Sequence, residues 1–392
     1  MAEQGPTRNS SLERHVAERY AEAARRVEPE LCCPVNYDPR YLKAIPQEVL
    51  DRDYGCGDPS AFLRLGETVL DLGSGGGKIC FIASQVVGPK GHVIGVDAND
   101  DMLALGRGAA PKVAQAVGYA NVRFLKGRIQ DLALDLDRLD ASLGENPPTT
   151  ASQWQALNAE MEDWRRTAPL VPDASVDVVV SNCVLNLVVP EDKPRLFREI
   201  HRVLKPGGRA VISDIVSDED VPEALQRDPD LWSGCISGAL REDRFLEAFE
   251  AASLYGMRLL KRESDPWRTV EGIEFRSVTV EAFKGKEGPC WERNQAAVYL
   301  GPFREVSDDD GHTYRRGVPA AVCDKTFRIL TRAPYAEHFS PVPPRVEVPP
   351  EAAKPFACAG GTRVRSARET KGETYGETTE AGPCCGDGGN CC

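Results

Sequence analysis

Three cysteines stand at positions where thiol chemistry could take place. Cys56 lies between two glycines in YGCG, Cys183 follows a β-branched run in SNCVLNL, and Cys235 follows a glycine in LWSGCISGA. The 392-residue chain has 13 cysteines, an odd count, and its sequence predicts no passage through an oxidising compartment. Cysteines in that setting serve as ligands, nucleophiles or redox couples more often than as structural disulfides. Several thiols that converge on one point could bind a soft metal or metalloid atom.

A glycine-rich loop provides the second chemical motif. The segment ETVLDLGSGGGK places Asp71, Gly73, Gly75 and Gly77 between a predicted strand and a predicted helix. Glycines let the backbone turn tightly and approach a ligand, and the helix that follows offers unpaired N–H groups. The spacing is G-x-G-x-G after an acidic residue, which differs from the G-x-G-x-x-G of dinucleotide enzymes. It favours S-adenosylmethionine, which carries no phosphate.

Residues after the next strands complete the predicted cofactor site. Asp97 lies 24 residues after Gly73, where a carboxylate can accept hydrogen bonds from both ribose hydroxyls. Asp71 is expected to hold the methionine ammonium group through a charge-assisted bond. The segment 126–131 is expected to meet the adenine through its backbone and Asp131. Within this segment Gly127, Arg128 and Ile129 belong to the predicted site, as do Ala98 and Asn182 elsewhere in the chain.

The elements that must position these residues follow a regular alternation. Predicted strands span 68–72, 92–97, 122–126, 175–181 and 209–214, and predicted helices span 79–87, 101–117 and 193–204. This order predicts an α/β fold with a doubly wound, Rossmann-like parallel sheet. After a mainly helical stretch, 222–255, the segments 257–262 and 276–283 are expected to complete the sheet.

Composition narrows the class of protein. The net charge is −12, with 60 acidic and 48 basic residues, and this argues against nucleic acid as a partner. The N-terminal residues lack the apolar core of a signal peptide, and no apolar run approaches the roughly 20 residues that span a bilayer. The five histidines form no cluster. We therefore expect a cytoplasmic monomer that acts on a small molecule and binds neither nucleic acid nor membrane.

Taken together and in this order, the motifs YGCG, DLGSGGGK, SNCVLNL and LWSGCISGA resemble the arsenite S-adenosylmethionine methyltransferase family of the class I methyltransferases. The resemblance covers the chain from about Cys32 to about Phe283. It implies trivalent arsenic held by thiolates beside the methyl donor, and detoxification by methylation. The matching positions are Cys56, Cys183 and Cys235, with Cys32 or Cys33 as a fourth.

The implied chemistry is physically consistent. Arsenic(III) is soft and prefers sulfur, and three thiolates leave its lone pair free as the nucleophile. Transfer then needs positioning and desolvation rather than a general base. Methylation raises arsenic to the pentavalent state, and a cysteine pair can reduce it by forming a disulfide. We expect Cys32 or Cys33 to pair with Cys56 in that step while Cys183 and Cys235 hold the metalloid. Thioredoxin or glutathione would then reduce the disulfide.

The remaining cysteines receive simpler interpretations. Cys80 lies within a predicted helix, where packing in the core is the expected role. Four cysteines crowd the last nine residues, where capture of metalloid, supply of reducing equivalents and no role at all remain open. Three others lie in no motif and are interpreted as structural or incidental: Cys290, Cys323 and Cys358.

Five regions follow from these patterns. We expect an N-terminal helix and cysteine-containing loops over 1–66, and a cofactor-binding core over 67–214 with an insertion at about 131–172. Arsenic-binding helices and the final strands are expected over 215–284, and a small C-terminal region over 285–332. The segment 333–392 is rich in Pro, Gly, Glu and Thr and is predicted to be disordered.

Two other functions are compatible with the sequence alone. One is a methyltransferase for a small organic acceptor such as a quinone or sterol, which would have a deep apolar pocket and tolerate the loss of Cys235. Cys183 taken by itself could be a buried small residue at the end of a strand. The other is a non-enzymatic, thiol-rich protein that sequesters metalloid and needs no S-adenosylmethionine.

Overall fold

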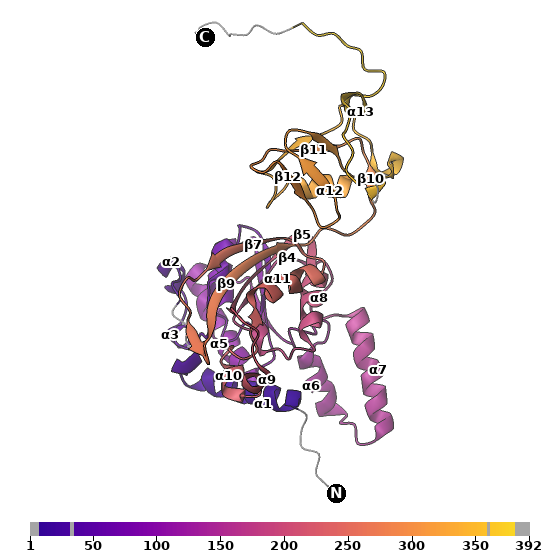
Figure 1. Ribbon diagram of the computed structural model, residues 1–392. Helices are drawn as coiled ribbons and strands as arrows, with labels where there is room; N and C mark the ends of the chain where they lie inside the picture. The colour runs from indigo at the N-terminus through magenta and orange to yellow at the C-terminus, as the bar shows by residue number, and fades with distance from the viewer. Residues whose placement is uncertain (1–7, 32–34, 359–360, 381–392) are drawn as a thin grey trace. The chain divides into compact units, whose positions relative to one another are not determined.

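The computed structural model describes residues 8–31, 35–358 and 361–380 (Figure 1). The chain forms two compact units that meet in sequence between Gly285 and Lys286. The predicted cysteines Cys32 and Cys33, and the four cysteines of the last nine residues, lie outside the described residues. Among the described residues, no helix combines the length and the apolar character that crossing a bilayer requires.

The first unit is built on a twisted, mainly parallel sheet. Its strands follow the order β3-β2-β1-β4-β5-β9-β7, with β6 beside β5 and β8 beside β9. The parallel strands are β1 (Thr68–Leu72), β2 (His92–Asp97), β3 (Val122–Lys126), β4 (Val176–Asn182) and β5 (Leu204–Ser217). Antiparallel to these run β9 (Ile273–Phe283) and β7 (Tyr255–Arg262). The predicted Rossmann-like α/β fold is confirmed.

Two short strands extend this sheet: β6 (Leu240–Arg241) and β8 (Arg268–Val270). The first pairs parallel with β5, and the second pairs antiparallel with β9.

Helices cover both faces of the sheet because alternate side chains of each strand point to opposite faces. On β4, Val178 and Val180 pack in a cluster with α4 (Lys78–Val87) and α5 (Asp100–Val117). The intervening Val179 packs on the other face with α8 (Lys193–Val203) and α11 (Glu242–Ala251). The valine run of β4 is therefore buried on both sides.

The insertion between β3 and β4 forms a helical hairpin of α6 (Leu136–Glu145) and α7 (Ala151–Thr167). Thr150 begins α7 with a capping box in which its side chain and that of Gln153 satisfy each other's backbone N–H groups. The insertion is therefore helical.

Shorter helices connect the remaining parts of the first unit. The N-terminal helix is α1 (Arg8–Arg25), which packs against α5 and α10. The others are α2 (Pro39–Leu42), α3 (Gln47–Leu50), α9 (Glu223–Gln226) and α10 (Pro229–Ser233). Helices α9 and α10 lie in the segment that immediately precedes Cys235.

The second unit is a small β-rich fold. Its three-stranded sheet has the order β14 (Pro319–Ala321), β11 (Ala296–Tyr299) and β15 (Phe339–Val342). Its other elements are β10 (Trp291–Glu292), β12 (Glu305–Ser307), β13 (Thr313–Arg315), α12 (Asp324–Leu330), β16 (Lys354–Pro355) and α13 (Ala367–Lys371).

Folded structure extends further along the chain than the predicted limit at residue 332. The Pro-rich composition of the following segment predicts disorder, but Phe339 is buried there between the rings of Tyr299 and Tyr314, with centroids 5.4 and 5.3 Å away. Arg365 is also buried and pairs with Glu292 at 2.6 Å. A few buried side chains thus provide a core for this segment, although its overall composition is that of a disordered chain.

Candidate active site

The glycine loop after β1 is shaped by contacts that only glycine permits. Gly73, Gly75 and Gly77 have φ angles of 67°, 50° and 90°, in the left-handed region. A Cβ atom at Gly73 would lie 2.4 Å from the Val184 side chain, and one at Gly77 would lie 2.5 Å from the Phe124 ring. Gly77 is also the N-cap of α4. The loop can therefore bring its backbone close to a ligand.

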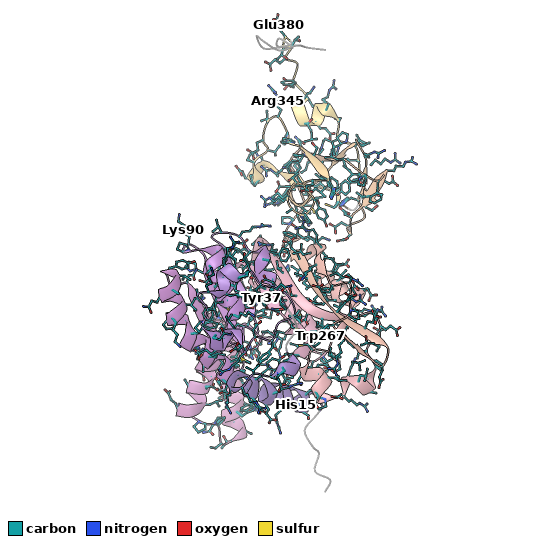
Figure 2. The ribbon with its side chains drawn as sticks, turned by 90° about the vertical axis from the view of Figure 1, so that its left-hand side faces the viewer. His15, Tyr37, Lys90, Trp267, Arg345 and Glu380 are labelled. Atoms are coloured by element: carbon teal, nitrogen blue, oxygen red, sulfur yellow. The ribbon has the colours of Figure 1, made fainter. Side chains whose placement is uncertain are left out.

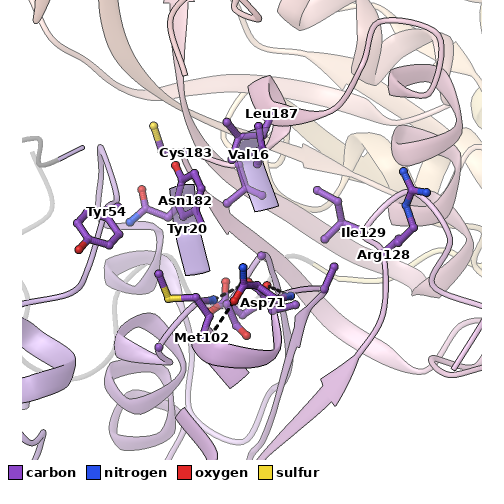
Figure 3. A pocket seen from close by; sticks show the side chains of 18 of the residues that line it. Val16, Tyr20, Tyr54, Asp71, Met102, Arg128, Ile129, Asn182, Cys183 and Leu187 are labelled. Carbon is purple, nitrogen blue, oxygen red and sulfur yellow. Dashed lines mark hydrogen bonds between the residues drawn. The ribbon is translucent and has the colours of Figure 1, made fainter. Parts of the chain in front are cut away.

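A pocket of about 380 Å³ opens beside this loop, at the carboxyl ends of the parallel strands (Figure 3). Figure 3 shows Cys183 and Asn182 on one side of it and Arg128 and Ile129 on the opposite side. Nine of the eleven cofactor residues predicted by name line the pocket: Asp71, Gly73, Gly75, Asp97, Ala98, Gly127, Arg128, Ile129 and Asn182. Gly77 is not among its lining residues and instead starts α4.

Asp71 is a buried carboxylate at the edge of this pocket. It is 2% exposed, and its Oδ2 accepts a hydrogen bond from the Cys80 thiol at 3.2 Å. Burial raises the pKa of Asp71 to about 7, an effect that the Cys80 bond only partly offsets. A carboxylate destabilised in this way would be stabilised by a cationic group placed in the pocket.

Asp97 is held in place by the backbone. Its two carboxylate oxygens accept hydrogen bonds from the amides of Gly75 and Asn99, each at 2.8 Å. Asn99 caps α5 and donates through its side chain to the Ala17 carbonyl of α1 at 3.0 Å. The carboxylate at the end of β2 is therefore fixed to the glycine loop on one side and indirectly to α1 on the other.

Asp131, which was expected to meet the adenine, does not line the pocket. Its carboxylate pairs with Arg165 at 2.8 Å and Arg195 at 2.9 Å. The first pair ties α7 to the loop after β3, so the position of Asp131 is that of a structural ion pair. Its neighbour Gln130 lines the pocket instead.

Asn182, at the end of β4, holds the loop that carries Cys56. Its Oδ1 accepts hydrogen bonds from the amides of Cys56 at 2.9 Å and Gly57 at 3.0 Å, and its Nδ2 donates to the Gly57 carbonyl at 2.8 Å. Tyr37, labelled in Figure 2, accepts from the same Nδ2 at 3.2 Å. A Cβ at Gly55 would lie 2.0 Å from Asn182. The small residues around Cys56 permit this close approach.

The Cys56 loop lies against the cysteine that follows β4. The sulfur atoms of Cys56 and Cys183 and a carboxylate oxygen of Asp214 all lie within 4.8 Å of one another, and the three residues are buried. Burial raises the pKa of Asp214 to about 6, although the amides of Leu185 and Ile215 donate to its carboxylate at 2.9 and 2.8 Å. The group is compact and shielded from water.

Cys235 joins the same buried cluster from the loop after α10. Its thiol donates to the Cys183 carbonyl at 3.0 Å, and it lies outside the 4.8 Å group formed by the two other thiols and Asp214. Cys183 and Cys235 have φ angles of 63° and 59°. Left-handed backbone at non-glycine residues is costly and concentrates at functional sites.

Two buried polar side chains join the Cys183 and Cys235 loops. Lys193 Nζ donates to the Leu185 carbonyl at 2.9 Å and to the Gly238 carbonyl at 3.0 Å. Asn186 Nδ2 donates to the Cys235 carbonyl at 3.3 Å. Burial lowers the pKa of Lys193 to about 8, and the nearby Asp214 counteracts this shift. The separation of the two cysteines is thus set by a hydrogen-bonded frame.

Two tyrosines that were not predicted as site residues line the pocket: Tyr20 of α1 and Tyr54 of the Cys56 loop. Tyr54 donates to the Ala23 carbonyl of α1 at 2.9 Å. Burial and the charges of the Cys235 and Cys183 thiols raise the pKa of Tyr20. The helix was predicted, but only the fold brings its Tyr20 face over the pocket. Tyr54 is the first residue of the YGCG motif, and its place beside Cys56 was a usable signal.

The fold is that of a class I, S-adenosylmethionine-dependent methyltransferase. A family model described as a methyltransferase domain matches residues 63–146 and 149–253. Within this class the chain belongs to the arsenite methyltransferase family. It is 32% identical over 325 residues to the arsenite methyltransferase of Aquipseudomonas alcaligenes, which covers 79% of this chain and 83% of that protein. The mouse arsenite methyltransferase is 29% identical, covering 79% of this chain and 75% of that protein.

A solved structure supports the same assignment. The arsenic(III) S-adenosylmethionine methyltransferase CrArsM of Chlamydomonas reinhardtii superposes with a TM-score of 0.53 at 27% identity, covering 83% of this chain and 100% of that chain. The second unit matches a different family model, a domain of unknown function (DUF8838), over residues 286–375.

Proposed function

We propose that this chain transfers a methyl group from S-adenosylmethionine to trivalent arsenic bound by its own cysteine thiolates. One observation carries this proposal above the others. Cys183 lines the cofactor pocket, and its sulfur lies within 4.8 Å of the Cys56 sulfur. A single residue thus belongs to both the methyl-donor pocket and the thiol cluster.

The pocket residues suit the proposed methyl donor. Asp71 would face the methionine ammonium, because burial destabilises the negative charge of its carboxylate and a nearby cation would stabilise that charge. Asp97 would accept from the ribose hydroxyls, and the segment 127–130 would contact the base. S-adenosylmethionine, when bound, supplies an electrophilic methyl group.

The thiol cluster suits a soft substrate. Cys56, Cys183 and Cys235 share one buried cluster, so arsenic bound there would be shielded from water. Three thiols that replace the three hydroxyls of arsenous acid give three As–S bonds and three water molecules. The remaining lone pair of arsenic acts as the nucleophile, and the role of the protein is to hold it beside the pocket.

A reduction step completes the proposed cycle. The methylated, pentavalent arsenic accepts two electrons from two cysteine thiolates, which form a disulfide. We assign this disulfide to Cys56 and either Cys32 or Cys33, and its reduction to an external thiol such as thioredoxin or glutathione. The active species is proposed to be a cytoplasmic monomer that serves detoxification of arsenite or its thiol adducts.

The direct test is speciation of the products. The full-length protein is incubated with arsenite, S-adenosylmethionine and a thiol reductant, and arsenic species are separated and quantified. Methylated arsenicals that require all three components would support the proposal. A protein that binds S-adenosylmethionine and methylates a quinone or sterol acceptor, but leaves arsenite unchanged, would contradict it. Failure to bind S-adenosylmethionine at all would favour a sequestering protein.

A further inference from the structure

The second unit contains a thiol cluster of its own. The sulfur atoms of Cys290, Cys323 and Cys358 all lie within 4.8 Å of one another, although the residues are far apart in sequence. Cys323 is buried, and Cys290 and Cys358 are partly exposed. The cluster is therefore both assembled by the fold and reachable from solvent. The interpretation of these three cysteines as structural or incidental did not anticipate this convergence.

Several contacts bring the three cysteines together. Cys290 directly precedes β10, which pairs antiparallel with β16 just before Cys358. The amide of Phe356 donates to the Cys290 carbonyl at 2.8 Å. Arg293, beyond β10, pairs at 2.9 Å with Asp324, the residue after Cys323. The backbone around each thiol is thus held by β pairing or by an ion pair.

The three thiols and their neighbours shift one another's pKa values. Burial would raise the pKa of Cys290, but hydrogen bonds from Cys358 and Cys323 and the charge of Lys325 lower it. Burial and the bond to Cys290 raise the pKa of Cys358. Cys323 accepts from the amide of Thr326 at 3.4 Å. The three sulfur atoms are thus close enough to act on one another, as the ligands of a single thiophilic atom would be.

We propose that Cys290, Cys323 and Cys358 form a second binding site for trivalent arsenic, separate from the methylation site. Arsenous acid and the three thiols give three As–S bonds and three water molecules. Three As–O and three S–H bonds break, arsenic stays trivalent, and no oxidant or reductant is consumed. The preference for arsenic rests on the proposed function, whereas the trithiol geometry does not depend on it.

The number of ligands separates arsenic from zinc. Structural zinc sites use four protein ligands, and Zn–S bonds of about 2.3 Å place two tetrahedral thiolates about 3.8 Å apart. The sulfur spacing here is close enough for either atom. However, among the described residues the cluster comprises three cysteines, with no histidine, carboxylate or fourth cysteine in the group. Three thiols fill the coordination of trivalent arsenic and leave zinc one protein ligand short.

Residue-resolved alkylation of the full chain tests this site. The reduced protein is treated with iodoacetamide with and without arsenite, in the absence of S-adenosylmethionine, and peptide mass spectrometry quantifies each cysteine. We expect arsenite to protect Cys290 and Cys358 together at about one equivalent per site. The variant Cys323→Ser should need at least tenfold more arsenite for the same protection. Since this buried substitution could unfold the unit, Cys358→Ser offers a second readout, in which protection of Cys290 weakens equally.

Matched variants separate this site from the methylation site. Cys183→Ser should leave the protection of Cys290 and Cys358 unchanged, because those thiols belong to a different cluster. Three results would overturn the inference: alkylation that arsenite does not slow, protection that survives Cys323→Ser and Cys358→Ser, or one zinc per chain at the cluster that arsenite cannot displace. Methylation activity is measured in a separate assay. A failure of the proposed second arsenic site can therefore be distinguished from a failure of the proposed methylation function.

Discussion

The side-chain oxygen of Asn182 accepts a hydrogen bond from the Cys56 amide at 2.9 Å, across 126 residues of sequence. The side-chain amide of Asn182 also accepts from the N–H of Gly57 and donates to the carbonyl of Gly57. Because Cys183 is the next residue after Asn182, this contact sets the position of one cysteine loop relative to the other. The geometry of the thiol cluster therefore depends on a residue that is not itself a thiol.

Replacement of Asn182 should separate the two thiols. Asn182→Ala removes these hydrogen bonds, and the loss of about 1–3 kcal/mol of interaction corresponds to a roughly 5- to 150-fold lower rate of arsenite methylation. Steady-state kinetics with product speciation gives this value. The exposed Asn146→Ala, at the end of α6, serves as the control and should match the unmodified protein. An Asn182→Ala variant with an unchanged rate would refute the positioning role.

The glycines beside Cys56 should tolerate no side chain. A Cβ at Gly57 would lie 2.7 Å from the Ser213 side chain, so Gly57→Ala must push the Cys56 loop away from the sheet. We expect at least a tenfold loss of methylation and a free energy of unfolding lower by about 1–3 kcal/mol.

The matched control for that substitution is Gly108→Ala. Gly108 lies in α5, and a Cβ there meets nothing within 4 Å. Alanine in a helix is favoured over glycine by about 0.5–1 kcal/mol, so this variant should be as stable as the unmodified protein or more stable. Chemical denaturation measures both variants. Equal stability of the two variants would show that the close approach at Gly57 is unimportant.

Binding of S-adenosylmethionine should depend on pH through Asp71. Burial raises the pKa of this carboxyl to about 7, and the ammonium of the ligand binds the ionised form. Affinity should therefore be highest at about pH 7.5–8, between protonation of Asp71 and deprotonation of the ligand ammonium, and fall about tenfold per pH unit below pH 6, where Asp71 is protonated before binding. Calorimetric titration from pH 5.5 to 8.5 gives the slope. Asp71→Asn should bind S-adenosylmethionine weakly at every pH, and its affinity should not depend on pH in the acidic part of this range. If the variant kept the pH dependence, the titrating group would be a residue other than Asp71.

Lys193 should act as a positioning residue for the two cysteine loops. Lys193→Met removes the donor of two buried hydrogen bonds and leaves the Leu185 and Gly238 carbonyls without it, which costs about 1–3 kcal/mol of stability. It also removes a cation near Asp214, so the pKa of Asp214 should rise and the pH profile of methylation should shift upward.

The control for Lys193 is Lys205→Met. Lys205 forms a partly exposed pair with Asp177, and such pairs contribute about 0–1 kcal/mol. Denaturation and pH–rate profiles distinguish the variants. If Lys193→Met destabilised the protein but left the pH profile unmoved, Lys193 would be structural only.

The sequence predicted the sheet and the convergence of most of the expected cofactor residues on one pocket, because both follow from local patterns. The β-branched run of β4 is buried on both faces, and the glycines and acidic residues at the ends of β1 and β2 lie where parallel sheets bind ligands. Asp71 and Asp97 therefore appear in the pocket as expected. Asp131 does not, because two arginines from α7 and α8 compete for its carboxylate, and sequence spacing carries no record of such pairs.

Contacts between distant segments escaped the sequence analysis. Tyr20 reaches the pocket only because α1 is anchored at α10, where Arg19 donates to Ser233 at 2.8 Å. Cys290, Cys323 and Cys358 show no paired-cysteine spacing, since β pairing and one ion pair bring them together. Such convergence depends on tertiary structure. The glycine loop, in contrast, is a short continuous segment, so its residues can be recognised from the sequence alone.

The central claim is that Cys183 joins the methyl-donor pocket to the arsenic-binding thiols. The most direct measurement is the rate of arsenite methylation by Cys183→Ser at saturating S-adenosylmethionine, alongside its affinity for S-adenosylmethionine. We predict a loss of at least about 100-fold in rate, because serine is a poor ligand for a soft atom, with the affinity changed by no more than about threefold. A Cys183→Ser protein that methylates arsenite at the full rate would contradict the account.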